Sequence, residues 1–274
     1  MPKVDFHIHT NLSDGVYSPE EVAKLAKDNK CHEIAITDHD NIADFTELAK
    51  TYDITIIPGI EFNTSIAGMH LLGYNIDNIN LINDKMASLK RENEKVCYQV
   101  IELMHNAGYD VSPNKIMEYL ESINLDSTIM DKRKLVKYLI YKGYASNTLT
   151  AYKELIGKNQ KFYVPNSKLT PKEVIDLVTE AKGITVLAHP RTLEVPINEL
   201  YRLINNLVMD GLKGIEIFNE KMLSDSCLYS DLTDYFKLIK TVGSDFHNPN
   251  SDDIGIEIDD ELYQSISKKL IKKY

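Results

Sequence analysis

Short apolar runs rich in β-branched residues alternate with amphipathic stretches along most of the chain. Seven of these runs have the length and composition of strands, namely Val4–Ile8, Glu33–Thr37, Ile54–Phe62, Met69–Asn75, Ile184–Ala188, Gly214–Phe218 and Lys240–Gly243. The alternation is typical of parallel strands joined by helices. The pattern therefore predicts an α/β fold, and seven strands suggest a barrel.

Two helix starts are marked clearly in the sequence. Ser18-Pro19-Glu20-Glu21 and Thr170-Pro171-Lys172-Glu173 each combine an N-cap hydroxyl, a proline at the first helical position and a capping-box glutamate. These are structural signals, and we assign them no chemistry.

Residues 81–160 follow a different pattern. Apolar positions such as Met86, Leu89, Val96 and Val100 recur at helical spacing, without intervening strand runs. We expect a barrel formed by residues 1–76 and 167–274, interrupted by a helical insert over residues 77–166.

Composition limits the protein class. The chain has 274 residues, of which 43% are hydrophobic and 26% charged, as in a folded globular protein. It shows neither a run of about 18 apolar residues nor a signal-peptide core, so we expect no membrane association and a cytoplasmic location. The three cysteines are far apart, which predicts reduced, buried thiols.

Charge is distributed unevenly. The net charge of −10 argues against a protein whose general role is to coat nucleic acid. Residues 77–166, however, hold 13 basic and 11 acidic residues, and residues 130–166 hold eight basic residues against Asp131 and Glu154 alone. This basic stretch is either a solvated helix face or a site for an anionic substrate.

Six of the eight histidines lie at the ends of predicted strands: His7, His9, His39, His70, His189 and His247. The carboxyl ends of parallel strands meet on one face, where side chains from distant positions can form a site. His32 and His105 lie in helix or loop contexts, and we expect no functional role for them.

Carboxylates accompany these histidines. His7 and His9 are two residues apart and therefore share one side of a strand. Asp38 and Asp40 flank His39, Glu61 follows Gly59, and Asp245 precedes His247 by two residues. Nitrogen and carboxylate ligands without sulfur suit Mn, Zn or Fe, and they are too numerous for one ion. The set predicts two or three divalent metal ions.

The same residues form an ordered series of motifs: His7-x-His9-Thr10, Ser13-Asp14-Gly15, Ile36-Thr37-Asp38-His39-Asp40, Gly59-x-Glu61, His70-Leu71-Leu72-Gly73-Tyr74, Leu187-Ala188-His189-Pro190 and Gly243-Ser244-Asp245-x-His247. The series resembles that of the PHP (polymerase and histidinol phosphatase) phosphoesterases. The insert, which ends in Phe162-Tyr163-Val164-Pro165, is similar to that of nucleoside 3′,5′-bisphosphate phosphatases and related 5′→3′ exoribonucleases.

This resemblance implies a distorted seven-stranded (β/α) barrel with a three-metal centre and a helical insertion domain. By resemblance the first metal is held by His7, His9, Glu61 and Asp245, the second by Asp14, His39 and His247, and the third by Glu61, His70 and His189. Glu61, His39 and Asp245 are the expected catalytic residues. Many relatives have histidine near Asp14, and the oxygen ligand here favours Mn²⁺, Mg²⁺ or Fe over Zn²⁺.

The resemblance also implies the reaction, in which a hydroxide bridging two metals attacks phosphorus in a phosphomonoester. The expected substrate is a small phosphorylated metabolite, a nucleotide of the 3′,5′-bisphosphate type, with the 5′ end of a short RNA as an extension. No obligate protein partner is expected.

Substrate contacts depart from the pattern of these relatives. Where they carry Thr-Arg-x-His, this chain reads Asp131-Lys132-Arg133-Lys134. Lys132 and Lys134 keep positive charge without the bidentate geometry of arginine, which should loosen selection among phosphate esters. Arg191 stands where relatives often have glycine, and it is either a phosphate ligand or an ordinary surface arginine.

Three alternatives stay open at this point. A histidinol-phosphate phosphatase would use the same chemistry, although Asp14 and the insert argue against it. A non-catalytic PHP module would bind metal or a protein partner without turnover. A barrel amidohydrolase also uses His-x-His ligands, but that class commonly adds a metal-bridging lysine, and no strand-end lysine is evident.

Overall fold

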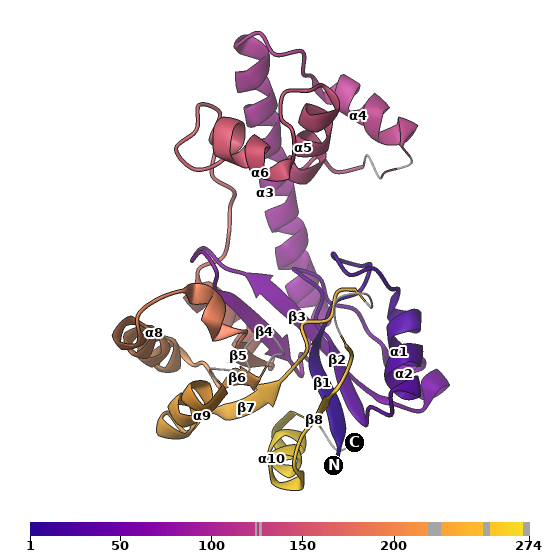
Figure 1. Ribbon diagram of the computed structural model, residues 1–274, viewed down its shortest axis with the longest axis vertical. Helices are drawn as coiled ribbons and strands as arrows, with labels where there is room; N and C mark the ends of the chain where they lie inside the picture. Colours follow the sequence, from indigo (N-terminus) through magenta and orange to yellow (C-terminus); the bar gives the residue numbers. More distant parts are fainter. Residues whose placement is uncertain (124, 126–127, 219–225, 249–252, 271–274) are drawn as a thin grey trace. The chain divides into compact units, whose positions relative to one another are not determined.

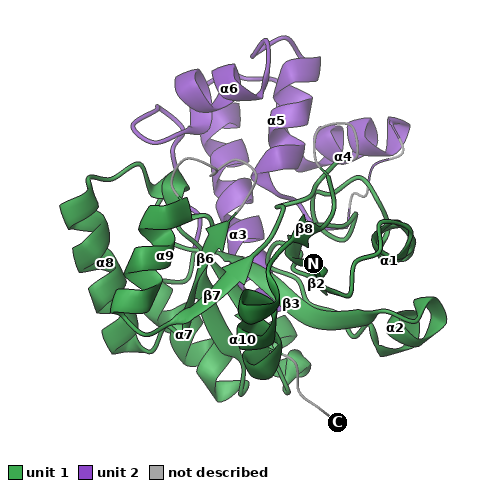
Figure 2. Ribbon diagram, turned by 60° about the horizontal axis from the view of Figure 1, so that its bottom comes forward, with its two compact units in different colours: residues 1–84, 168–274 green, residues 85–167 purple. Residues whose placement is uncertain are grey.

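A computed structural model describes residues 1–123, 125, 128–218, 226–248 and 253–270. The chain divides into two compact units, with residues 1–84 and 168–274 in unit 1 and residues 85–167 in unit 2 (Figure 2).

Unit 1 is built on one eight-stranded sheet in the order β7-β6-β5-β4-β3-β2-β1-β8 (Figure 1). The strands are β1 (Lys3–Ile8), β2 (Glu33–Ile36), β3 (Thr55–Asn63), β4 (His70–Tyr74), β5 (Ile184–Leu187), β6 (Gly214–Phe218), β7 (Ile239–Val242) and β8 (Ile256–Glu257). The helices of this unit lie on the outer side of the strands. This arrangement confirms the predicted α/β barrel, with one strand more than expected.

The sheet curls until its two ends nearly meet. β8 pairs antiparallel with the first residues of β1, at Lys3 and Val4. Just after β7, Phe246 forms a parallel bridge to Ile8, and its carbonyl accepts a hydrogen bond of 2.9 Å from the backbone N–H of His9. The segment after β7 is thereby joined to the end of β1, which nearly closes the barrel.

The direction of β4 differs from the sequence-based expectation. β1, β2 and β3 pair in parallel, as do β5, β6 and β7, but β4 runs antiparallel to both β3 and β5. Only a short turn separates β3 from β4, too short for the crossover that a parallel pair requires. As a result, the first residue of β4 lies beside the last residue of β3, with His70 opposite Asn63.

The outer helices of unit 1 are α1 (Pro19–Asp28), α2 (Thr46–Tyr52), α7 (Pro171–Glu180), α8 (Ile197–Asp210), α9 (Ser226–Tyr235) and α10 (Asp260–Leu270), with a 3₁₀ turn at Pro190–Leu193. Two of them, α1 and α7, begin where the sequence predicts. Ser18 and Thr170 both form complete capping boxes, with Glu21 and Glu173. The buried face of α1 packs on the outer side of β1 and β2, so Ile8 points towards this helix.

Unit 2 is helical and has its own core. The helix α3 (Ile79–Asn106) leads into it from unit 1, followed by α4 (Pro113–Ser122), α5 (Lys132–Tyr141), α6 (Thr148–Ala151) and a π-helical turn at Tyr152–Ile156. Buried side chains from all of these helices, including Val100, Leu120 and Leu139, form one apolar cluster. The cluster explains the helical periodicity of this part of the sequence.

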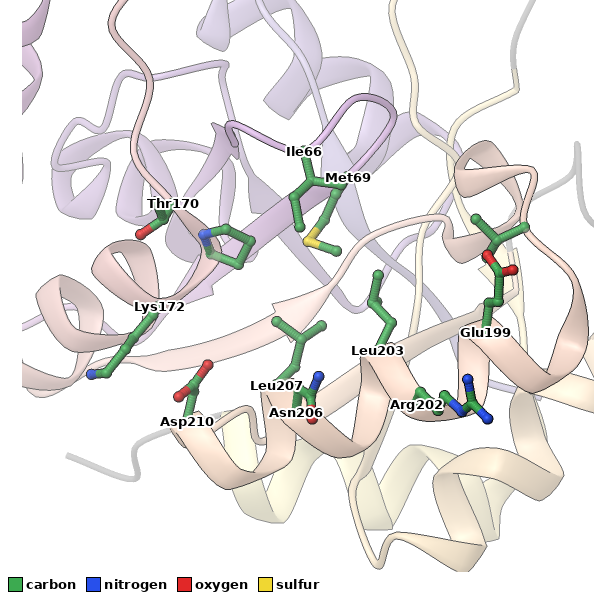
Figure 3. A pocket seen from close by; sticks show the side chains of 12 residues that line it. Ile66, Met69, Thr170, Lys172, Glu199, Arg202, Leu203, Asn206, Leu207 and Asp210 are labelled. Carbon is green, nitrogen blue, oxygen red and sulfur yellow. The ribbon is translucent and has the colours of Figure 1, made fainter.

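A hollow of about 450 Å³ lies between α7, α8 and the turn before β4 (Figure 3). Ile66 and Met69 face Leu203 and Leu207 across it. None of the predicted metal ligands lines this hollow.

No described helix has the length and apolar character needed to cross a bilayer. Of the three cysteines, Cys31 and Cys97 are buried and Cys227 is exposed, so the expectation of three buried thiols was wrong for Cys227.

Candidate metal centre

The nine predicted metal ligands all belong to unit 1 and gather at one edge of its sheet. They come from β1 and the loop after it (His7, His9, Asp14), from the residues following β2 (His39), from β3 and the start of β4 (Glu61, His70), and from the segments that follow β5 and β7 (His189, Asp245, His247). His70 opens its strand, yet it reaches the same edge because β4 runs against its neighbours.

Glu61 occupies the middle of this cluster and is almost fully buried. Its Oε1 atom lies 2.9 Å from Nδ1 of His70 and 2.8 Å from Nε2 of His189. Its Oε2 atom has three imidazole nitrogens around it, Nε2 of His7 at 3.3 Å, Nε2 of His9 at 3.1 Å and Nδ1 of His39 at 3.2 Å. One carboxylate therefore faces five histidines.

Two aspartates complete the cluster on either side of His9. Oδ1 of Asp245 lies 3.4 Å from Nε2 of His9 and 3.5 Å from Nε2 of His7. Oδ1 of Asp14 lies 3.6 Å from Nδ1 of His9 and 3.4 Å from Nε2 of His247. His9 thus presents one ring nitrogen to each aspartate.

The ligand atoms fall into three overlapping groups that could each hold an ion: His7, His9, Glu61 and Asp245; His9, Asp14, His39 and His247; and His39, Glu61 and His70. A neutral imidazole has one free nitrogen lone pair, so His9 can serve only one of its two groups. The first group has the same members as the first expected ligand set. The third group contains His39, whereas the expected set had His189.

The buried histidines fit metal binding in a further respect. Nε2 of His7 and both ring nitrogens of His9 are inaccessible to solvent and form no hydrogen bond of good geometry within the described residues. Buried polar atoms without such a partner are costly, and metal ions would satisfy Nε2 of His7 and one of the two ring nitrogens of His9. The donor set of imidazoles and carboxylates suits a divalent ion.

Electrostatics keeps the carboxylates of the cluster ionised. Burial raises the pKa of Glu61, but the charges and hydrogen bonds of histidines such as His7 and His189 hold it well below its usual range. Burial likewise raises the pKa of Asp14, yet a hydrogen bond from His247 and the charges of nearby histidines bring it down to about 2. Ionised carboxylates are the form that binds metal.

The pKa values of the histidines are shifted in both directions. Burial lowers the pKa of His39, and the opposing charge of Glu61 does not restore it. Burial also lowers the pKa of His247, but Asp14 and Asp245 more than offset this and raise it to about 9. A metal ion that binds at His247 must therefore displace a proton.

The backbone around Asp245 is conformationally special. Asp245 has φ of 57°, in the left-handed region, directly before the bridge between Phe246 and Ile8. Its backbone N–H donates to the carbonyl of His7 at 2.9 Å. Aspartate tolerates this conformation better than most residues, and such positions concentrate at functional sites. The turn aims the Asp245 carboxylate at the histidines of β1.

Three buried acids support the ligands; Glu216 and Asp5 were not predicted, and Asp38 was noted only as a neighbour of His39. Glu216 accepts hydrogen bonds from the backbone N–H of His189 and lies 3.0 Å from Nδ1 of His7. Asp38 accepts from Thr10, and Asp5 accepts from Ser244 and Gly255. Burial raises the pKa of Asp5 to about 6, despite these hydrogen bonds. The signal in the sequence was an isolated acid inside an apolar strand run, as in Ile215-Glu216-Ile217.

The predicted substrate-binding cations lie in different units. Lys132 and Lys134 begin α5 in unit 2, where their ammonium groups donate to backbone carbonyls of the same unit, those of Val164 and Ile129. Lys132 is buried, and burial lowers its pKa. Arg191 is exposed in unit 1, two residues after His189.

Curated relatives cover most of this chain and most of their own length. The chain is 29% identical over 257 residues to a 5′-3′ exoribonuclease of Haemophilus influenzae, covering 90% of each. It is 28% identical to a phosphoribosyl 1,2-cyclic phosphate 1,2-diphosphodiesterase of Eggerthella lenta, covering 89% of this chain and 93% of that one. A 3′,5′-nucleoside bisphosphate phosphatase of Chromobacterium violaceum is 24% identical, with 91% and 88% covered.

A solved structure shares the fold over nearly the whole chain. A candidate metal-dependent phosphoesterase of Bifidobacterium adolescentis superimposes with a TM-score of 0.72 at 21% identity, covering 98% of this chain and 96% of that one. The family model of the PHP domain matches residues 5–273. The chain therefore belongs to the PHP domain family of metal-dependent phosphoesterases, and the histidines and carboxylates at one edge of its barrel could hold the metal.

Proposed function

We propose that this phosphoesterase hydrolyses a phosphomonoester of a small nucleotide of the 3′,5′-bisphosphate type, with the 5′ end of a short RNA as an extended substrate. The observation that carries the proposal is the cluster of three metal-binding groups around Glu61. Relatives named as a bisphosphate phosphatase and as 5′-3′ exoribonucleases, matched over most of their length, support the substrate class.

The proposed cofactors are two or three divalent ions, Mn, Fe or Zn, with Mg also compatible. His7, His9, Glu61 and Asp245 would hold the first ion, Asp14, His39 and His247 the second, and Glu61, His70 and His189 the third. Bound ions supply Lewis acidity at phosphorus and lower the pKa of water towards neutrality. Glu61 and Asp245 supply fixed negative charge, and the lowered pKa of His39 keeps its imidazole neutral and able to ligate.

Arg191 is the proposed phosphate contact of the barrel, because its guanidinium can bind a phosphate in a bidentate manner two residues from His189. Lys132 and Lys134 are the proposed contacts of unit 2. Their ammonium groups bind backbone carbonyls in this structure, so a phosphate would have to share or replace those hydrogen bonds.

The test compares phosphate release from adenosine 3′,5′-bisphosphate and from histidinol phosphate by the Mn²⁺-loaded protein. A third arm uses a cyclic phosphodiester, because the Eggerthella relative is named for such a substrate. We expect preferential cleavage of the bisphosphate. Preferential cleavage of histidinol phosphate or of the cyclic diester would refute the proposed substrate class.

Two alanine variants give the control. His39→Ala removes a proposed ligand whose Nδ1 lies 3.2 Å from Glu61, and it should abolish release. His32→Ala removes an exposed histidine at the start of β2 that lies in none of the three groups, and it should leave the rate unchanged. Equal rates in the two variants would contradict the role given to His39.

A further inference from the structure

Glu216 is a buried acid that belongs to none of the three metal-binding groups. It lies in the middle of β6, between Ile215 and Ile217, and only 1% of its surface is exposed. An unpaired acid in such a place would be strongly destabilising, so its contacts must compensate for burial.

The two oxygens of Glu216 contact two different ligand-bearing strands. Oε1 lies 3.0 Å from Nδ1 of His7, which comes from β1. Oε2 accepts a hydrogen bond of 2.7 Å from the backbone N–H of His189, which follows β5. His7 and His189 are 182 positions apart in the sequence, and their rings stack at 5.6 Å between centroids. One side chain therefore links two proposed ligands.

The contact with His7 decides which of its ring nitrogens is free. An ionised carboxylate only accepts hydrogen bonds, so Nδ1 of His7 must carry the proton. In the neutral imidazole that can bind metal, Nε2 then keeps the lone pair, and it points towards Glu61 at 3.3 Å and Asp245 at 3.5 Å. That is the nitrogen with no hydrogen bond of good geometry in the described part of the chain.

We propose that Glu216 is a positioning residue, which fixes the Nδ1–H tautomer of His7 and the backbone of His189 at once, so that both histidines present Nε2 to the metal centre. This inference rests on the proposed metal ligands. Carboxylate partners of this kind orient metal-bound histidines in many proteins, and their loss typically weakens metal binding by about 10- to 100-fold.

A glutamine at this position cannot replace both contacts. Its amide has the shape of the carboxylate but offers one acceptor oxygen and one NH₂ donor. If the oxygen faces His7, the NH₂ group meets the N–H of His189, and two donors oppose each other. If the amide is reversed, Nδ1 of His7 becomes the acceptor and its proton moves to Nε2, where it blocks metal binding.

The experiment measures Mn²⁺ affinity by competition with a chelator in wild type, Glu216→Gln and Thr241→Val. Thr241 pairs with Glu216 on the adjacent strand, and its buried hydroxyl has no hydrogen bond among the described residues. Its replacement is therefore a matched change on the same face of the sheet. We expect Glu216→Gln to weaken binding by about 10- to 100-fold, with Thr241→Val close to wild type and both variants folded by circular dichroism.

Two further measurements do not depend on how well Glu216→Gln folds. Glu216→Asp keeps both acceptor oxygens on a shorter arm and should bind Mn²⁺ more tightly than Glu216→Gln. Long-range ¹H–¹⁵N spectra of the Zn²⁺-loaded wild type should show the proton of His7 on Nδ1. A proton on Nε2 of His7 would overturn the inference.

Metal affinity also separates this inference from the proposed function. Equal Mn²⁺ affinity in wild type and Glu216→Gln would overturn the positioning role alone. Failure of the wild-type protein itself to bind any of Mn²⁺, Fe²⁺ and Zn²⁺ would overturn the proposed metal centre and, with it, this inference.

Discussion

Replacing Gly243 by alanine should damage both the barrel and its metal centre. Gly243 follows β7, where the chain passes directly against β1. A Cβ atom added at this position would lie 2.2 Å from Cβ of His7 and 2.8 Å from Oε1 of Glu216. Non-bonded carbon atoms prefer separations of about 3.5–4.0 Å, so β1 and the end of β7 must move apart by more than about 1 Å.

The expected cost follows from two opposing contributions. Forcing an extra methyl group into a packed core costs about 1–3 kcal/mol. Alanine also restricts the unfolded chain, which returns about 0.4–1 kcal/mol. The net loss of unfolding free energy is therefore about 1–2 kcal/mol. Because the strand that moves carries His7, turnover should fall further, by about 100-fold for a displacement near 1 Å.

Urea unfolding and phosphate release from the Mn²⁺-loaded protein measure the two effects separately. Gly108→Ala provides a control of similar stability cost, because Gly108 has φ of 90° and a Cβ there meets no atom within 4 Å. Alanine in that left-handed conformation costs about 1–2 kcal/mol. Gly108 lies in unit 2, whereas every proposed metal ligand lies in unit 1. The rate of phosphate release per folded molecule should therefore stay near that of wild type.

The two variants together decide the question. Gly243→Ala could unfold at the same urea concentration as wild type and keep the wild-type rate of phosphate release. That result would refute the close approach of the end of β7 to β1. If both glycine variants lose activity equally, the loss reflects general destabilisation, and the specific displacement of His7 is refuted.

Three further predictions concern stability. Tyr74→Phe removes the hydroxyl that donates to the carbonyl of Phe6 at 2.6 Å and should cost about 1–3 kcal/mol in urea unfolding; an unchanged midpoint would contradict this bond. Ser18→Ala removes the capping box of α1 and should cost about 1 kcal/mol without changing turnover. Burial raises the pKa of Glu33, despite hydrogen bonds from two hydroxyls of α10, so the folded chain binds this proton more tightly and loses stability as the pH rises above about 4.3. The unfolding free energy of Glu33→Gln should therefore rise relative to that of wild type between pH 4 and pH 7. A difference between the two proteins that stays constant over this range would refute the direction given for the pKa shift of Glu33.

Much of the fold could be predicted because strand runs and helix caps are local signals. The predicted strand Ile54–Phe62 is found as Thr55–Asn63, and the capping boxes at Ser18 and Thr170 both form. The strand β8 was missed because its two residues are too short to show an alternating pattern. The reversed direction of β4 was missed because side-chain periodicity is the same in both directions.

The candidate site was predictable to a similar depth. Strand-end histidines and acids indicated which side chains would meet, and the structure brings all nine together. How closely each side chain approaches Glu61 could not be predicted, because it depends on the register of strands far apart in the chain. Glu216 was missed because its role depends on two contacts across the barrel, to residues 209 and 27 positions away.

For the barrel, everything between residues 75 and 183 is the loop of a single hairpin. β4 and β5 are antiparallel neighbours, and their last pair is Tyr74 with Ile184, so the ends of this long excursion are about 5 Å apart. Within unit 2 the excursion is drawn together again, since the side chain of Asn93 accepts from the N–H of Ser167 at 2.7 Å and donates to its carbonyl at 3.0 Å.

Such a connection allows unit 2 to change without disturbing the strands of the barrel. Closing a loop costs only slightly more as it lengthens, about 0.6 kcal/mol for each doubling. Residues 85–167 can therefore be enlarged, reduced or exchanged for another module with neighbouring ends, while Tyr74 and Ile184 stay paired and the strands that carry the histidines keep their register. The fold lets one catalytic barrel carry different modules in a single loop.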